Sequence, residues 1–167
     1  VGAVGIIMGA LYQTGLGVKF ASLVTQYSFG YLFVGIVLVG LASFVLGMGL
    51  PTSASYIVLS VMAVPALLEL GQGHEIVITV LSAHLIVFWF SLDSSFTPPV
   101  CVPAYTAAGI ADAKPNKGAW AAFRTAKGMY VVPMLFAFSP LLLLDQPFLV
   151  AEVMFFSIIG FMALAAV

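Results

Sequence analysis

The chain has 167 residues, of which 63% are hydrophobic and 7% are charged, and its formal net charge is −1 at pH 7. Soluble domains are roughly 45–50% apolar and about 25% charged, so the composition excludes a soluble protein and predicts an integral membrane protein. The apolar runs lack the alternation of membrane barrel strands, which favours an all-α fold. Nothing in the charge pattern suggests a nucleic-acid partner.

Both ends of the sequence lie in apolar runs. The chain opens on Val1 without an initiator methionine or a charged signal region, and it closes on Val167. We therefore expect the sequence to be a fragment of a longer membrane protein.

The first half of the chain predicts a helix end followed by a hairpin. Residues 1–29 indicate the end of a transmembrane helix, terminated near the glycines of 14–17, and then an interfacial segment. Two apolar arms follow over 31–46 and 56–70, and each has about 15 residues, short of the ~20 that a span needs. Residues 30–71 therefore predict a re-entrant hairpin with its tip at 47–53. Two tilted full spans are the alternative.

The second half predicts a broken helix and two further spans. Residues 76–111 indicate one transmembrane helix interrupted near its middle, because Pro98 and Pro99 cannot lie inside a regular helix. Residues 112–128 predict a basic loop with a short interfacial helix. Residues 129–145 predict a span kinked at Pro133 and Pro140, and 148–167 the start of another.

Four of the five basic residues lie between positions 112 and 127. The positive-inside rule therefore predicts that this loop is cytoplasmic and that residues 69–75 and 145–147, which carry acidic residues, are external. Lys19 falls on the external side and disagrees with this orientation.

The hairpin tip and the proline break are both rich in hydroxyl groups. Discontinuous helices hold Na⁺ and substrate in secondary transporters, and the helix N-termini after each break offer N–H groups to an anion. The alternative is a kinked helix whose hydroxyls bond back to its own backbone. The candidate substrate-binding residues are Ser53, Ser55, Ser94 and Thr97. The candidate Na⁺ ligands are Gly47, Gly49, Thr52, Ser95 and Thr97.

Two ionisable residues within the apolar segments have two possible roles each. Asp93 could coordinate Na⁺, but we expect it to cap the broken helix through its neighbours' N–H groups. His84 could relay protons, as intramembrane ionisable residues often do, but we expect it to be a neutral histidine bonded to a helix neighbour.

An ordered series of motifs resembles the large membrane subunit of TRAP transporters, especially the TAXI branch, whose permease is often one fused polypeptide. The motifs are residues 47–52 (GMGLPT), 84–90 (HLIVFWF), 93–100 (DSSFTPPV), 104–111 (AYTAAGIA) and 118–123 (GAWAAF). Members often carry Asn or Asp where this chain has Ser95, which departs from the family pattern.

The resemblance implies an elevator-type, Na⁺-coupled importer of organic acids in a bacterial or archaeal cytoplasmic membrane. It implies an extracytoplasmic substrate-binding protein as partner, and a small membrane subunit or its fused equivalent. Residues 31–70 would then be the second hairpin of an inverted repeat, facing the break at residues 97–99.

Other classes of function fit the sequence less well. An intramembrane enzyme would need a nucleophile–base pair or a metal cluster, and no zinc spacing or Gly-x-Ser-x-Gly turn is present in the sequence. We therefore predict a protein that is not an enzyme. A related Na⁺-dicarboxylate carrier without a binding protein and a purely structural membrane subunit are the alternatives.

Overall fold

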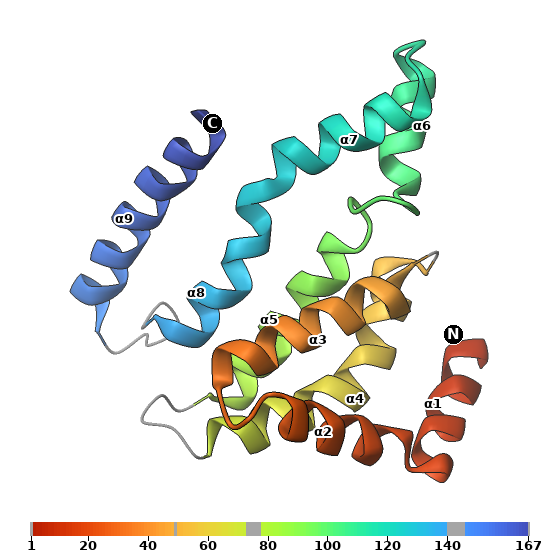
Figure 1. The fold of residues 1–167 in the computed structure, drawn as a ribbon, viewed down its shortest axis with the longest axis vertical. Helices are drawn as coiled ribbons and strands as arrows, with labels where there is room; N and C mark the ends of the chain where they lie inside the picture. Colours follow the sequence, from red (N-terminus) through yellow and green to blue (C-terminus); the bar gives the residue numbers. More distant parts are fainter. Residues whose placement is uncertain (1, 49, 73–77, 140–145, 167) are drawn as a thin grey trace.

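The computed structural model describes residues 2–48, 50–72, 78–139 and 146–166, and these residues form an all-helical structure (Figure 1). The elements are α1 (Gly2–Thr14), α2 (Leu16–Tyr27), α3 (Leu32–Gly47), α4 (Thr52–Gly71), α5 (Val80–Asp93), α6 (Val102–Ile110), α7 (Pro115–Thr125), the 3-10 helix η1 (Ala126–Val131), α8 (Val132–Phe138) and α9 (Pro147–Ala166). Among these described elements, α4 and α9 are long and apolar enough to cross a membrane.

A left-handed glycine separates the first two helices. Gly15 has a φ of 65°, which glycine adopts without a Cβ clash, and the chain turns there from α1 into α2. Helix α2 then lies against α4, where Gly17 faces the Val61 carbonyl oxygen. The segment expected at the membrane interface is thus a helix packed on the hairpin.

The hairpin arms are unequal in length. Helix α3 has 16 residues, near the expected 15, but α4 has 20 and begins at Thr52 rather than near Tyr56. The helix starts earlier because Pro51, with φ −59° and ψ 145°, lies just before its first turn, where a missing N–H breaks no helical hydrogen bond. By length and composition α4 is able to span, so the re-entrant arrangement stays a prediction.

The proline break separates α5 from α6. Helix α5 ends at Asp93 and α6 begins at Val102, and both prolines of the break lie in the non-helical segment between them. The N-terminus of α5 is capped by Thr79, whose Oγ1 accepts the Ser82 N–H at 3.1 Å.

The basic segment holds a helix, and the helical run continues from it. The short helix predicted within 112–128 is α7, and η1 and α8 follow it directly up to Phe138. The predicted span over 129–145 is described only up to residue 139. Pro133 occupies the first turn of α8, where its lack of an N–H is tolerated, so it starts a helix rather than kinking one. Pro140 lies outside the described residues.

The core lies where α3, α4 and α5 meet. Its fully buried side chains include Ile36 and Val39 from α3, Leu59 and Leu67 from α4, and Ile86 from α5. Two parts extend from this core in Figure 1: the pair of α6 and α7, and the separate helix α9, whose apolar surface is not buried by the rest of the described chain. The core therefore supports the two breaks, which lie at its edge.

Gly40 allows α3 to approach α5, and we expect its replacement to destabilise the fold. A Cβ on Gly40 would lie 2.9 Å from two ring carbons of Phe90, which is buried and stacks edge-on against Phe44. Gly40→Ala should cost about 1–3 kcal/mol by overpacking. The measurement is thermal unfolding of the purified protein in detergent.

Gly109→Ala is the matched control for this substitution. Gly109 lies in α6 with no atom within 4 Å of its would-be Cβ, so alanine should leave stability unchanged or raise it slightly. Equal melting temperatures for the two variants would contradict the packing of α3 on α5.

Candidate functional site

The hairpin tip and the proline break enclose one cavity. It has a volume of about 420 Å³, and residues from both breaks line it although they are far apart in the sequence. The lining residues are Gly47, Leu50, Pro51 and Thr52 from the tip, and Ser95, Val100, Val102 and Pro103 from the break and the start of α6. The structure thus brings together Gly47, Thr52 and Ser95, three of the candidate Na⁺ ligands.

Two contacts hold the tip against the break. The hydroxyls of Thr52 and Ser95 are 3.4 Å apart, within hydrogen-bonding distance. At the end of α3, a Cβ on Gly47 would lie 2.7 Å from the Ser94 Cβ and 3.0 Å from the Ser55 Oγ. Because real Cβ atoms do not approach so closely, this junction forms only with glycine at position 47 or with displaced neighbours.

Two helix N-termini border the cavity. Helix α4 begins at Thr52 and α6 at Val102, and neither has a side-chain cap. The first N–H groups of a helix have no partner within it, and the helix dipole makes that end favourable for negative charge. The cavity therefore combines hydroxyl oxygens, which suit a hard cation, with helix ends that suit an anion.

Thr97 lies on another side of the break. Its Oγ1 donates to the Asp93 carbonyl oxygen at 2.7 Å and lies 2.9 Å from the Tyr130 hydroxyl. Since the Thr97 proton is engaged by the carbonyl, Tyr130 donates to Thr97. The hydroxyl is thus directed toward η1, and Thr97 does not line the cavity. Tyr130 was not identified from the sequence, where it is one hydroxyl in an otherwise apolar segment.

The remaining candidates have different surroundings. Ser94 donates to the Ser91 carbonyl oxygen at 2.8 Å, as in the helix-bonding alternative. Ser55 is 1% exposed, and its hydroxyl has no hydrogen-bond partner among the described residues. Ser53 is exposed at the start of α4, away from the cavity lining. Gly49 lies outside the described residues.

Asp93 does not cap the broken helix as expected. The residue is 1% exposed, and neither carboxylate oxygen has a hydrogen-bond partner in the part of the chain that the structure describes. Burying a carboxyl group without a partner is costly, and such residues within membrane segments usually serve a function.

His84 bonds to a residue of the neighbouring helix α4. Its Nδ1 lies 2.9 Å from the Tyr56 hydroxyl, so it connects α5 to α4 rather than to its own backbone. In the same helix, the Trp89 indole N–H donates to the Met129 carbonyl oxygen at 3.0 Å. These bonds fix the helix that carries the break against the hairpin on one side and η1 on the other.

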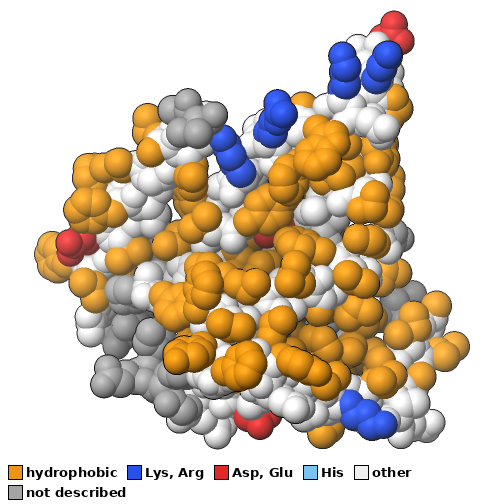
Figure 2. All heavy atoms as spheres, viewed as in Figure 1, with side chains coloured by type: hydrophobic (Ala, Val, Ile, Leu, Met, Phe, Trp, Pro, Cys, Tyr) orange, Lys and Arg blue, Asp and Glu red, His pale blue; other side chains and the backbone are white. Residues whose placement is uncertain are grey.

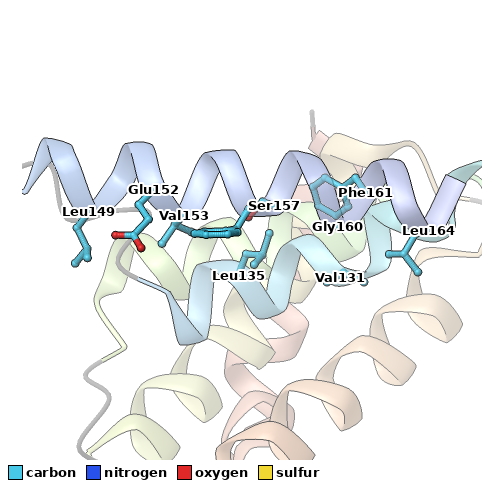
Figure 3. A pocket seen from close by; sticks show the side chains of 10 residues that line it. Val131, Leu135, Leu149, Glu152, Val153, Ser157, Gly160, Phe161 and Leu164 are labelled. Carbon is cyan, nitrogen blue, oxygen red and sulfur yellow. The ribbon is translucent and has the colours of Figure 1, made fainter. Parts of the chain in front are cut away.

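A larger cavity of about 750 Å³ lies between α9 and the η1–α8 segment (Figure 3). Its lining is mainly apolar, with Glu152 as the charged residue that points into it. Because neither break contributes to this cavity, it does not unite the groups that the sequence identifies, and the smaller cavity is the candidate site.

Residues 1–150 match the protein family described as the DctM component of the tripartite ATP-independent periplasmic transporter. The match includes the hairpin, both breaks and α7, whereas most of α9 lies beyond it. No curated protein and no solved structure matches the chain. Since the matched residues make up most of the sequence, the chain belongs to the DctM family, the membrane permease component of these transporters.

Proposed function

We propose that this chain forms part of the transport domain of a Na⁺-coupled permease that imports organic acids. The observation that carries the proposal is the meeting of the hairpin tip and the proline break around one cavity, with Thr52 and Ser95 in contact. Two interrupted helices that face each other are the arrangement by which secondary transporters hold ions and substrate.

The residues at this junction fit a Na⁺ ion. Na⁺ is a hard cation that needs several oxygen ligands, and neither break supplies enough by itself. We assign the backbone carbonyls of Gly47 and Gly49 and the Thr52 hydroxyl to the tip, and the Ser95 hydroxyl to the break. The Thr97 hydroxyl is left out of the ion site, because it is bonded to Tyr130 outside the cavity lining. The ion would supply positive charge beside the substrate's carboxylate.

The substrate part of the proposal rests on the uncapped starts of α4 and α6. Their N–H groups would bind a carboxylate, and the Ser55 hydroxyl, which lies beside Gly47 of the cavity lining and has no described partner, would orient it. An ion that bridges the tip to the break would order this neighbouring site, which would couple the binding of Na⁺ to that of substrate.

We further propose the TAXI-type arrangement, in which an extracytoplasmic substrate-binding protein delivers the organic acid. The permease would work with a small membrane subunit or its fused equivalent, and it would move by an elevator mechanism in a bacterial or archaeal cytoplasmic membrane. The family match supports the general association with these partners, and the motifs of residues 93–111 support the TAXI assignment.

The proposed orientation places α7 on the cytoplasmic side. Figure 2 shows basic side chains gathered along the upper edge of the molecule, where Figure 1 places α7. The C-terminal end of α4, which is followed by Gln72, lies toward the opposite end of the molecule from α7 (Figure 1). The uneven distribution of Lys and Arg supports this orientation by the positive-inside rule.

Removing a hydroxyl from either break should weaken the response to Na⁺. Thr52→Val and Ser95→Ala each delete one hydroxyl that lines the cavity while roughly preserving the shape of the side chain. Each should cost about 1–3 kcal/mol of Na⁺ binding, and so raise the Na⁺ concentration for half-maximal uptake roughly 5- to 150-fold. The assay is organic-acid uptake into proteoliposomes against external Na⁺, with the binding protein supplied.

Thr106→Val is the matched control for these two variants. Thr106 is exposed on α6, and its hydroxyl bonds only the Val102 carbonyl of its own helix, at 3.0 Å. If Thr52→Val and Ser95→Ala keep the wild-type Na⁺ response, as Thr106→Val should, the shared ion site is wrong.

Cysteine labelling tests the orientation. Lys117→Cys and Gln72→Cys, each in a Cys101→Ser background, place a thiol at positions that are exposed in the structure. In intact cells an impermeant maleimide should label the Gln72→Cys variant, and should label the Lys117→Cys variant only after permeabilisation. The reverse pattern would overturn the proposed topology.

A further inference from the structure

A groove on the outer face of α7 combines two basic side chains with an aromatic ring. It has a volume of about 410 Å³. Its lining residues are Asn116, Lys117, Trp120, Ala121 and Arg124. Residues three, four and seven positions apart lie on one side of an α-helix, so Lys117, Trp120 and Arg124 form a single stripe.

The opposite face of α7 packs against α6, so the stripe of Lys117, Trp120 and Arg124 faces away from α6. A Cβ on Gly118 would lie 2.6 Å from the Ala108 Cβ, which shows how closely the two helices approach. Ala119 is 2% exposed and packs in a small cluster with Cys101 and Ala104. Lys117 and Arg124 must therefore face away from the protein, and both are exposed.

The positive charges of this stripe are not neutralised within the described chain. No described carboxylate forms an ion pair with Lys117 or Arg124, and the nearest acidic residue in the sequence, Asp112, precedes α7. Trp120 lies between the two bases with 56% of its surface exposed and its ring edge-on to Phe123. The groove thus offers cationic groups beside an apolar surface.

We propose that this groove binds the phosphate headgroup of an anionic phospholipid in the leaflet that α7 faces. Arg124 would pair with the phosphate through its planar guanidinium, and Lys117 would contribute a point charge. Trp120 would lie at the headgroup level, where amphipathic aromatic rings are favoured. A lipid fits better than free phosphate because Trp120 and Ala121 provide surface for the apolar part of the ligand. The inference rests on the proposed placement of α7 at the membrane surface.

The test is native mass spectrometry of the purified transporter that contains this chain. Phosphatidylglycerol and phosphatidylcholine with identical acyl chains are titrated separately, without Na⁺ or substrate. The wild type should prefer phosphatidylglycerol, and K117Q/R124Q should lower that preference on the order of tenfold, because each base near a membrane surface contributes to anionic lipid binding. The charge-preserving variant K117R/R124K should keep the preference, and inorganic phosphate should not displace the lipid.

The matched control, K19Q/K127Q, removes the same charge from positions outside the groove lining, since Lys127 borders Trp89 and Phe161 instead. It should bind phosphatidylglycerol like the wild type, and equal melting temperatures in phosphatidylcholine would show that the variants are folded. The proposal is overturned if the wild type has no preference, if the control loses as much as K117Q/R124Q, or if inorganic phosphate competes equally. Because uptake is not measured, failure of the Na⁺ proposal would not produce any of these results.

Discussion

The close approach of Gly47 to Ser94 is the contact on which the candidate site depends. It brings the end of α3 against the segment that follows α5, and the Thr52–Ser95 pair lies beside it. Any side chain at position 47 would have to occupy the space now filled by the Ser94 side chain. The cavity and the hydroxyl pair therefore depend on one junction without a Cβ.

Interrupted helices inside a membrane are acceptable only when the protein satisfies the freed backbone groups. Both breaks do so partly by tight turns: the Leu50 N–H bonds the Gly47 carbonyl at 3.2 Å, and the Phe96 N–H bonds the Asp93 carbonyl at 3.1 Å. The uncapped starts of α4 and α6 contribute Thr52 and Val102 to the lining of the shared cavity. The same constraint that makes a break costly thus concentrates polar groups at one place.

Side-chain hydrogen bonds between helices hold this arrangement. Tyr56 and His84 connect the second hairpin arm to α5, Thr97 and Tyr130 connect the break to η1, and the Trp89 indole bonds the η1 backbone. Each bond joins elements that carry or support a break. The core of α3, α4 and α5 buries apolar surface. The side-chain hydrogen bonds fix how the helices are aligned along one another, because each bond needs its two partners within about 3 Å.

The sequence by itself determined the membrane class, the helical fold and the positions of the two breaks. Composition and the residues Gly47, Pro51, Pro98 and Pro99 suffice for this, because backbone restrictions of glycine and proline act locally. The start of α4 at Thr52 was missed, since the first turn of a helix tolerates the proline that precedes it.

Only the tertiary structure decided which hydroxyls meet. Thr52 and Ser95 share a cavity, whereas Thr97, two residues after Ser95, is bonded to Tyr130, and Asp93 is buried without a described partner. The sequence pattern does not tell which of these neighbouring polar residues lines the cavity, because the direction of each side chain depends on how α5, the break and η1 pack. The physical reason is that pairing across helices depends on the angle and depth of their contact, which arise from the whole core.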